Sequence, residues 1–151
     1  MRKFEVVKDE FRKTTGEIKL PTRSDKGSAG YDIYTPYAFE IKPKETVFIT
    51  TDVKIAMEED EVMFLFVRSS TGIKRRLMLA TSVSVIDSTY YSNPENDGNL
   101  IVVLTNMGEE TQTFEQHERF VQGVFCKYLT VDNDAPLNAK RTGGIGSSGK
   151  K

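Results

Sequence analysis

One acidic residue is a candidate catalyst because it directly follows a predicted strand. Residues 83–86 form a largely β-branched run, and Asp87 comes immediately after it. Such a run predicts a half-buried strand, and residues 88–91 resemble a hairpin turn, so we expect the Asp87 carboxylate at the lip of a sheet. Tyr90 follows closely, which would place a proton acceptor beside a flat apolar surface that suits a small substrate with a ring. For this stretch alone, a strand that runs into an ordinary turn is the alternative.

A second candidate site is a cradle for phosphate groups. The most apolar run of the chain, residues 62–67, ends abruptly in Arg68, Ser69 and Ser70, with Gly72 close behind. A guanidinium fork, two hydroxyls and the backbone amides near a glycine are suitable donors for phosphate oxygens. The same tripeptide also occurs in ordinary surface turns. From these residues alone, a surface turn without a ligand is the alternative.

A second acid, Asp32, falls inside a short predicted strand that follows the small residues 27–30. A buried carboxylate at such a position needs a charged or hydrogen-bonding partner, because leaving it unpaired is strongly destabilising. The alternative is that Asp32 lies on the exposed face of an edge strand.

The glycine-rich C-terminal tail is a further candidate for binding phosphate. Residues 144–150 have the spacing of a P-loop, but Lys151 stands where that motif requires serine or threonine, which argues against a P-loop. Arg141, Ser147 and Ser148 could still fold around a phosphate chain. A disordered end is the alternative.

Composition bounds the class of protein. With 151 residues, 38% hydrophobic and 28% charged content, we expect one soluble globular domain, and a net charge of −1 argues against a nucleic-acid or membrane partner. The single cysteine, Cys126, excludes an intrachain disulfide, and with one histidine it excludes the usual zinc sets. We interpret His117 as a turn residue and Cys126 as a small apolar filler. The composition and the absence of a targeting signal favour a cytoplasmic protein.

The hydrophobic pattern predicts an all-β protein of roughly ten short strands with few or no helices, as in a sandwich, barrel or jelly roll. We expect one β domain over residues 1–140 and a glycine-rich arm over 141–151. Residues 58–61 are interpreted as a solvated acidic turn, and residues 92–98 as a polar loop. Strands are expected at 4–7, 17–20, 31–33, 39–41, 46–55, 62–67, 83–86, 99–106, 111–114 and 124–129.

Five segments, in this order, resemble the five motifs of the trimeric dUTPase family. They are A-G-Y-D-I-Y at 29–34, R-S-S-T-G at 68–72, V-I-D-S-T-Y at 85–90, E-R-F-V-Q at 118–122 and R-T-G-G-I-G-S-S-G at 141–149. The resemblance implies a jelly roll that forms a homotrimer with shared active sites. It also implies hydrolysis of dUTP to dUMP and pyrophosphate, which limits uracil in DNA and supplies dUMP for dTMP synthesis.

The resemblance assigns roles to the residues of the third motif. Asp87 would orient the water that attacks the α-phosphorus, and Tyr90 would pack beneath the deoxyribose and leave no room for a 2′-hydroxyl. Uracil would be read by the backbone of a hairpin, at the positions of Thr81, Val85, Ile86 and Ile101.

The remaining motifs are implied to hold the triphosphate. Arg68, Ser69, Ser70 and Gln122 would bind phosphates, with Gly72 and Arg119 in support. Asp32 would act through the hydration shell of a Mg²⁺ ion that the triphosphate carries, with no direct protein ligand. From a different subunit, the arm would close over the site with Arg141, Ile145, Ser147 and Ser148.

This sequence departs from the family pattern at several positions. Ile145 replaces a usual aromatic that stacks on uracil, Thr81 replaces a common asparagine, Ser84 a common glycine and Thr89 a common acid. Residues 91–98 form a longer loop than the usual turn, which could add a subunit contact or a surface for a regulatory protein partner.

The sequence leaves two other functions as alternatives. The related dCTP deaminases need a glutamate on the strand after the third motif, where residues 100–104 here are aliphatic. A regulatory binding protein with secondary or lost hydrolysis is the other alternative, and retention of Asp87, Tyr90, Gln122 and Arg141 argues against simple loss of activity.

Overall fold

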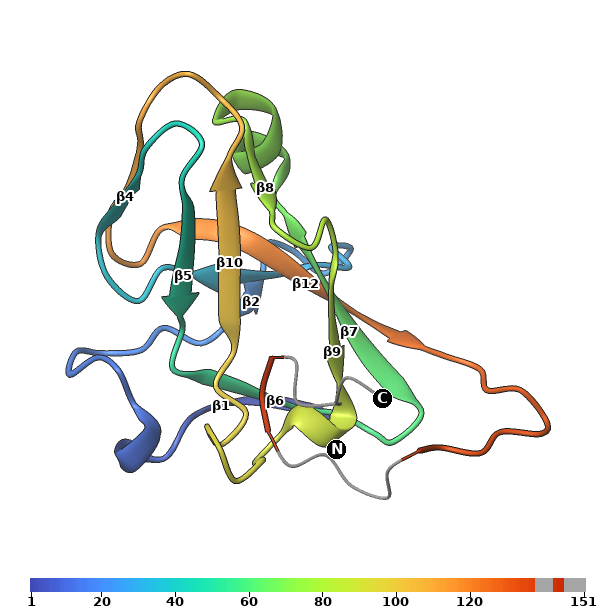
Figure 1. The fold of residues 1–151 in the computed structure, drawn as a ribbon. Coiled ribbons are helices and arrows are strands. Elements are labelled where there is room, and N and C mark those ends of the chain that lie inside the picture. Colours follow the sequence, from blue (N-terminus) through green and yellow to red (C-terminus); the bar gives the residue numbers. More distant parts are fainter. Residues whose placement is uncertain (138–142, 146–151) are drawn as a thin grey trace.

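The computed structural model describes residues 1–137 and 143–145, and these residues form twelve antiparallel strands in four small sheets (Figure 1). Three single-turn segments, η1 (Asp9–Phe11), η2 (Ser70–Lys74) and η3 (Ser88–Tyr90), complete the regular structure described. The all-β prediction is therefore confirmed. The strands are β1 (Lys3–Val6), β2 (Thr22–Arg23), β3 (Tyr31–Tyr34), β4 (Phe39–Ile41), β5 (Thr46–Thr50), β6 (Val53–Ala56), β7 (Glu61–Val67), β8 (Leu77–Leu79), β9 (Ser84–Asp87), β10 (Ile101–Asn106), β11 (Gln112–Phe114) and β12 (Arg119–Lys127).

The largest sheet has the strand order β2-β3-β12-β7-β9. Four of the five sequence motifs lie on its strands or begin directly after one of them. Gln122 of β12 lies opposite Asp32 of β3, and Val121 of β12 lies opposite Val67 of β7. This register brings the first, second and fourth motifs to one region of the sheet. The third motif lies on β9, along the other side of β7.

A second sheet, in the order β5-β10-β8, supplies the wall that faces the third motif. Along β10, Val102 and Leu104 are buried in the core, while Ile101 and Val103 point to the opposite side. This alternation is the ordinary consequence of the two-residue period of a strand. It leaves β10 with one side in the hydrophobic core and the other side available to a pocket.

The structure corrects three of the sequence predictions. The expected strand over 46–55 is two strands in different sheets, because the chain breaks at Asp52, which has a φ of 60°. Glu61 is not part of a solvated turn but is 2% exposed at the start of β7, where it pairs with Arg2 at 2.5 Å. The expected strand over 17–20 is absent, and β2 begins two residues later, at Thr22.

Candidate active site

The first candidate cluster is built around the carboxylate of Asp32. Asp32 is 6% exposed, and its Oδ1 lies 2.8 Å from Nε of Arg68 while its Oδ2 lies 3.2 Å from Nη1 of Arg119. Ser24 donates a third contact, from Oγ to Oδ2, at 3.1 Å. The alternative of an exposed edge position for Asp32 is thus wrong, because β3 lies between β2 and β12 and the carboxylate is paired. Asp32 thus holds the guanidinium groups of Arg68 and Arg119 at one end of the five-stranded sheet.

The end of β7 places the second motif as the sequence predicted. The buried strand ends at Val67, and Arg68 then begins a tight turn in which the Gly72 amide donates to the Arg68 carbonyl at 2.9 Å. A side chain at Gly72 would approach Val67 Cγ2 to 3.2 Å, so the turn packs closely against the strand. Ser69 and Ser70 are exposed beside this turn. Both serines are therefore accessible to a ligand at this end of β7.

A cavity of about 380 Å³ adjoins this turn, and its charge is predominantly positive. Sequence reasoning missed two of its cations, Lys74 and Arg75, although they follow the second motif directly. Arg75 is held by an ion pair with Glu118 and by the ring of Phe114, whose centroid lies 4.1 Å from Cζ of Arg75. Such a surface suits a phosphate-bearing ligand. The lining residues are Arg68, Ser70, Thr71, Lys74, Arg75, Glu118 and Arg119.

Gln122 belongs to the same cluster through its register with Asp32. Its amide group packs against the first motif so closely that a side chain at Gly30 would come within 2.5 Å of Gln122 Oε1. Nε2 of Gln122 points toward the Val67 carbonyl at 3.5 Å. A larger residue at position 30 would therefore displace the Gln122 amide from its present position.

The second candidate cluster lines a pocket of about 520 Å³ on the β9 side of the molecule. This volume lies within the range usual for small-molecule sites. The predicted residues Thr81, Val85, Ile86, Asp87, Tyr90, Ile101 and Ile145 all line it. The structure thus brings together the third motif, the start of β10 and part of the C-terminal arm.

Sequence reasoning missed the contribution of β5 to this pocket. Phe48 lies opposite Val103 of β10, and both side chains line the pocket, with Phe48 65% exposed. The alternation of Thr46, Phe48 and Thr50 with buried Ile49 places Phe48 on the outer side, but the pairing with β10 is visible only in the fold. The pocket therefore has an aromatic residue at its wall that no sequence motif indicated.

Asp87 ends β9, as predicted, and lies beside Tyr90 at the pocket wall. The residues after it form η3 instead of the expected hairpin turn, with the Tyr91 amide donating to the Ser88 carbonyl at 3.3 Å. The hairpin expected around Thr81, Val85 and Ile86 is not formed by two strands paired with each other, because β8 pairs with β10 and β9 pairs with β7. Thr81 and Ser84 are instead joined by a contact between their hydroxyls at 3.0 Å.

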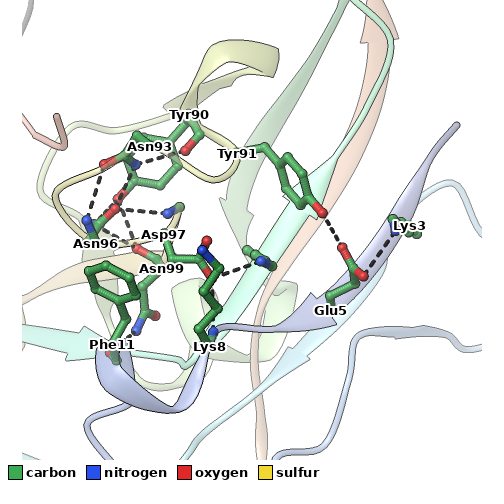
Figure 2. Close-up of polar contacts among 12 residues, drawn as sticks. Lys3, Glu5, Lys8, Phe11, Tyr90, Tyr91, Asn93, Asn96, Asp97 and Asn99 are labelled. Carbon is green, nitrogen blue, oxygen red and sulfur yellow. Dashed lines mark hydrogen bonds and ion pairs between the residues drawn. The ribbon is translucent and has the colours of Figure 1, made fainter. Parts of the chain in front are cut away.

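Tyr90 is fixed by three asparagines that sequence reasoning did not single out (Figure 2). Its hydroxyl donates to the Asn99 carbonyl at 2.9 Å and accepts from Nδ2 of Asn96 at 2.8 Å. Nδ2 of Asn93 donates to the Tyr90 carbonyl at 2.8 Å. Since Tyr90 is only 7% exposed and its hydroxyl is held from two sides, its ring is kept in one orientation as a rigid wall of the pocket.

Residues 92–98 form a loop, as expected, and this loop is anchored to the rest of the fold by side-chain contacts of Asp97. Asp97 is buried, and its Oδ2 lies 2.8 Å from Nζ of Lys54 and accepts from the Lys8 amide at 2.9 Å (Figure 2). Burial alone would raise the pKa of Asp97, but the hydrogen bonds from Lys54 and Lys8 outweigh it and lower the pKa. The loop is thereby tied to β6 and to the N-terminal segment.

The described part of the C-terminal arm, residues 143–145, packs on the pocket of its own chain. Gly143 and Gly144 are buried, and the Gly144 amide donates to Oε2 of Glu95. Ile145 is 68% exposed and lines the pocket. The resemblance implied an arm from a different subunit, and three of the residues it named, Arg141, Ser147 and Ser148, lie outside the described residues.

The two clusters lie far apart within one chain. Asp87 pairs with Val62 at one end of β7, whereas Arg68 follows the other end of that strand. The strand from Val62 to Arg68 spans about 20 Å at the usual rise per residue. A single small ligand therefore cannot contact Asp87 and Arg68 of the same chain at once.

Within the described residues, no group of three or more His, Cys, Asp or Glu side chains is arranged to hold a metal ion. Nor does this part of the chain contain a helix of the length and apolarity that a membrane span requires.

Comparison with known proteins agrees with this geometry. A model of the dUTPase family matches residues 16–149. The deoxyuridine 5′-triphosphate nucleotidohydrolase of Lactococcus lactis is 41% identical over 99% of this chain and 98% of its own length. That of Haemophilus influenzae is 32% identical over 89% of this chain and 90% of its own. A solved dUTPase structure from Streptococcus mutans superimposes with a TM-score of 0.76, is 41% identical, and covers 85% of this chain and 98% of its own. The chain belongs to the dUTPase family.

Proposed function

We propose that this protein hydrolyses dUTP to dUMP and pyrophosphate, which limits uracil in DNA and supplies dUMP for dTMP synthesis. The observation that carries the proposal is the pocket of about 520 Å³, which is lined by the carboxylate residue Asp87, by the fixed Tyr90 and by residues 81 and 83–86. A nucleoside fits this volume, and the cationic cluster at Arg68 and Arg119 suits its triphosphate.

In the proposed reaction, Asp87 orients a water molecule and accepts its proton as the water oxygen bonds to the α-phosphorus. The bond from the α-phosphorus to the bridging oxygen breaks, and pyrophosphate leaves with the electron pair. Arginine side chains stabilise the charge that develops on the phosphate oxygens. General-base assistance of this kind is worth about 10²- to 10⁴-fold in rate.

Substrate selection would depend on the fixed shape of the pocket. Tyr90 cannot turn aside, because Asn96 and Asn99 hold its hydroxyl, so its ring would exclude a ribose 2′-hydroxyl. Backbone donors and acceptors near Thr81 and Ile86 would pair with the edge of uracil and mismatch that of cytosine. A site built to hydrogen-bond one base discriminates strongly, because the wrong base leaves buried polar groups unpaired.

The separation of Asp87 from Arg68 supports an active site shared between subunits. In each active site, one chain would supply the uracil pocket and Asp87, which orients the attacking water. A neighbouring chain would supply the phosphate-binding cluster. A closed ring of identical chains provides every site with both halves. The homotrimer implied by the family resemblance meets this requirement.

The resemblance also implies Mg²⁺, and the residues present fit an outer-shell role for it. Asp32 is a single carboxylate already paired with two arginines, so it would hold the ion through bound water while the triphosphate supplies the direct ligands. When bound, the ion would neutralise charge on the phosphates. Asp32 itself would keep Arg68 and Arg119 aligned for the phosphate chain.

Two other functions fit the structure less well. Deamination of dCTP would need a glutamate on β10, where Ile101, Val102, Val103 and Leu104 stand. A regulatory partner at residues 91–98 would need that loop as a free surface, whereas Asn93 and Asp97 within it are buried. The inward contacts favour a role for the loop in the site itself.

The test is a pyrophosphate-release assay on dUTP, dCTP, dTTP and UTP with Mg²⁺ present. We expect rapid hydrolysis of dUTP and rates at least about a hundredfold lower for the other three nucleotides. Equal rates on dUTP and dCTP would exclude the proposed reading of the base.

A further inference from the structure

We infer that Glu95 and Asn96 are positioning residues that join the C-terminal arm to Tyr90 and so set the affinity for substrate. The inference rests on the proposed function, and it gives a purpose to the long loop after the third motif. Glu95 receives the arm, and Asn96 holds the ring against which the arm packs.

Glu95 receives the arm through its carboxylate. Oε2 of Glu95 accepts the backbone N–H of Gly144, and this hydrogen bond to a charged acceptor is of the stronger kind. Glu95 is itself oriented, because its amide donates to Oδ1 of Asn93 at 3.1 Å. Ile145 follows Gly144 directly and lines the pocket. The contact with Glu95 therefore fixes the backbone that carries Ile145 to the pocket.

Asn96 lies between the arm and the tyrosine. Its Nδ2 donates to the Tyr90 hydroxyl at 2.8 Å, and its Oδ1 accepts from Asn93 at 2.7 Å and from the Gly98 amide at 3.0 Å. A side chain at Gly144 would lie 3.5 Å from Nδ2 of Asn96 and 3.8 Å from the Tyr90 hydroxyl. The arm thus packs in van der Waals range of the amide that fixes Tyr90.

The loop that carries these two residues is rigid. Gly98 has a φ of 81°, and a side chain there would come within 2.8 Å of the Tyr90 carbonyl, so only glycine fits. Asp97, which directly follows Asn96, anchors the loop through its contacts with Lys54 and Lys8. A preformed platform lowers the entropic cost of ordering the arm when substrate binds.

The consequence is an effect on binding more than on chemistry. Asp87 is not among the contacts that Glu95 makes in the described part of the chain, so loss of the Glu95 carboxylate leaves the proposed base in place. It removes the hydrogen bond that keeps Ile145 over the pocket. Ile145 has no ring to stack on a base. The arm of this protein therefore depends on the Glu95 contact for its position more than an arm with an aromatic residue at position 145 would.

The experiment compares Glu95→Ala with the matched control Glu109→Ala, whose glutamate is exposed beyond the far end of β10. We expect KM for dUTP to rise about tenfold in Glu95→Ala, the effect of one hydrogen bond to a charged group, while kcat changes less than about twofold. Glu95→Gln keeps an acceptor oxygen, so it should recover part of the loss. Amide hydrogen exchange at Gly144 should be faster in Glu95→Ala and unchanged in Glu109→Ala.

A double-mutant cycle isolates the contact, because Gly144→Pro removes the N–H that Glu95 accepts. In the Gly144→Pro background, Glu95→Ala should raise KM no further. The inference is overturned if Glu95→Ala matches Glu109→Ala in KM and in exchange at Gly144, or if it raises KM equally in both backgrounds. Absence of dUTP hydrolysis by the parent protein would instead overturn the proposed function, and the exchange measurement would still decide the contact.

Discussion

Asp87 and Arg68 lie at opposite ends of β7, with Asp87 paired to Val62 and Arg68 directly after Val67. This arrangement predicts that two inactive variants complement each other. Asp87→Asn and Arg68→Ala should each be inactive alone, since each spoils every site. In randomly mixed trimers, about a quarter of the sites would take an intact Asp87 from one chain and an intact Arg68 from its neighbour.

The measurement is dUTP hydrolysis after unfolding and refolding the two variants together. Each variant refolded alone is the control. If the mixture is as inactive as its components, the two residues do not meet across subunits.

Removing the Tyr90 hydroxyl should destabilise the fold and leave the ring in place. Tyr90→Phe leaves the buried Asn99 carbonyl and the Asn96 amide without their shared partner, which costs about 1–3 kcal/mol in the free energy of unfolding. Urea denaturation measures this loss. Tyr128→Phe is the control, since Tyr128 is 45% exposed and donates its hydrogen bond to the Glu59 carbonyl at the surface. If Tyr90→Phe and Tyr128→Phe have the same free energy of unfolding, the contacts of the Tyr90 hydroxyl with Asn96 and Asn99 contribute little to stability.

The fold should lose stability in acid through Asp52. Burial alone would raise the pKa of this carboxyl, but hydrogen bonds from Asn99, Lys13 and Thr14 outweigh it and hold the pKa below its ordinary value. A carboxyl with a depressed pKa in the folded state stabilises that state above its unfolded pKa, and the contribution is lost as the pH falls through the folded pKa.

Asp52→Asn should therefore cost about 1–3 kcal/mol at pH 7, and its difference from the parent should shrink below about pH 4. Urea titrations from pH 7 to pH 2.5 measure both quantities. A difference that stays constant over this range would exclude a depressed pKa for Asp52.

An aromatic residue at position 145 should tighten substrate binding. Ile145 lines the pocket and is 68% exposed, so Ile145→Phe has room to place a ring over a bound base. The added stacking is worth about 0.5–1.5 kcal/mol, which corresponds to a KM about two- to tenfold lower. Ile145→Leu serves as the control for size. If both variants behave alike, the arm does not bring residue 145 against the base.

The sequence predicted those parts of the fold that depend on local pattern. The continuous apolar run at 62–67 predicted β7 and the exposed turn after it, and the β-branched run before Asp87 predicted the end of β9. Both predictions needed only the burial preferences of neighbouring residues.

The parts that sequence reasoning missed depend on partners that are distant in the chain. Asp52 breaks the expected strand because it accepts hydrogen bonds from Lys13 and Thr14, and Glu61 is buried because it pairs with Arg2. The asparagines around Tyr90 were also missed: they are close to it in the chain, but their local pattern does not show that they contact its hydroxyl or its carbonyl. Phe48 joins the pocket only through the pairing of β5 with β10.

The most direct test of the account is the rate of pyrophosphate release from dUTP by Asp87→Asn. Asparagine preserves the size of the side chain but cannot accept the proton of the attacking water. We predict a fall in kcat of about 10²- to 10⁴-fold, with dUTP still bound at a similar affinity. A variant that releases pyrophosphate as fast as the parent would contradict the assignment of Asp87 as the base.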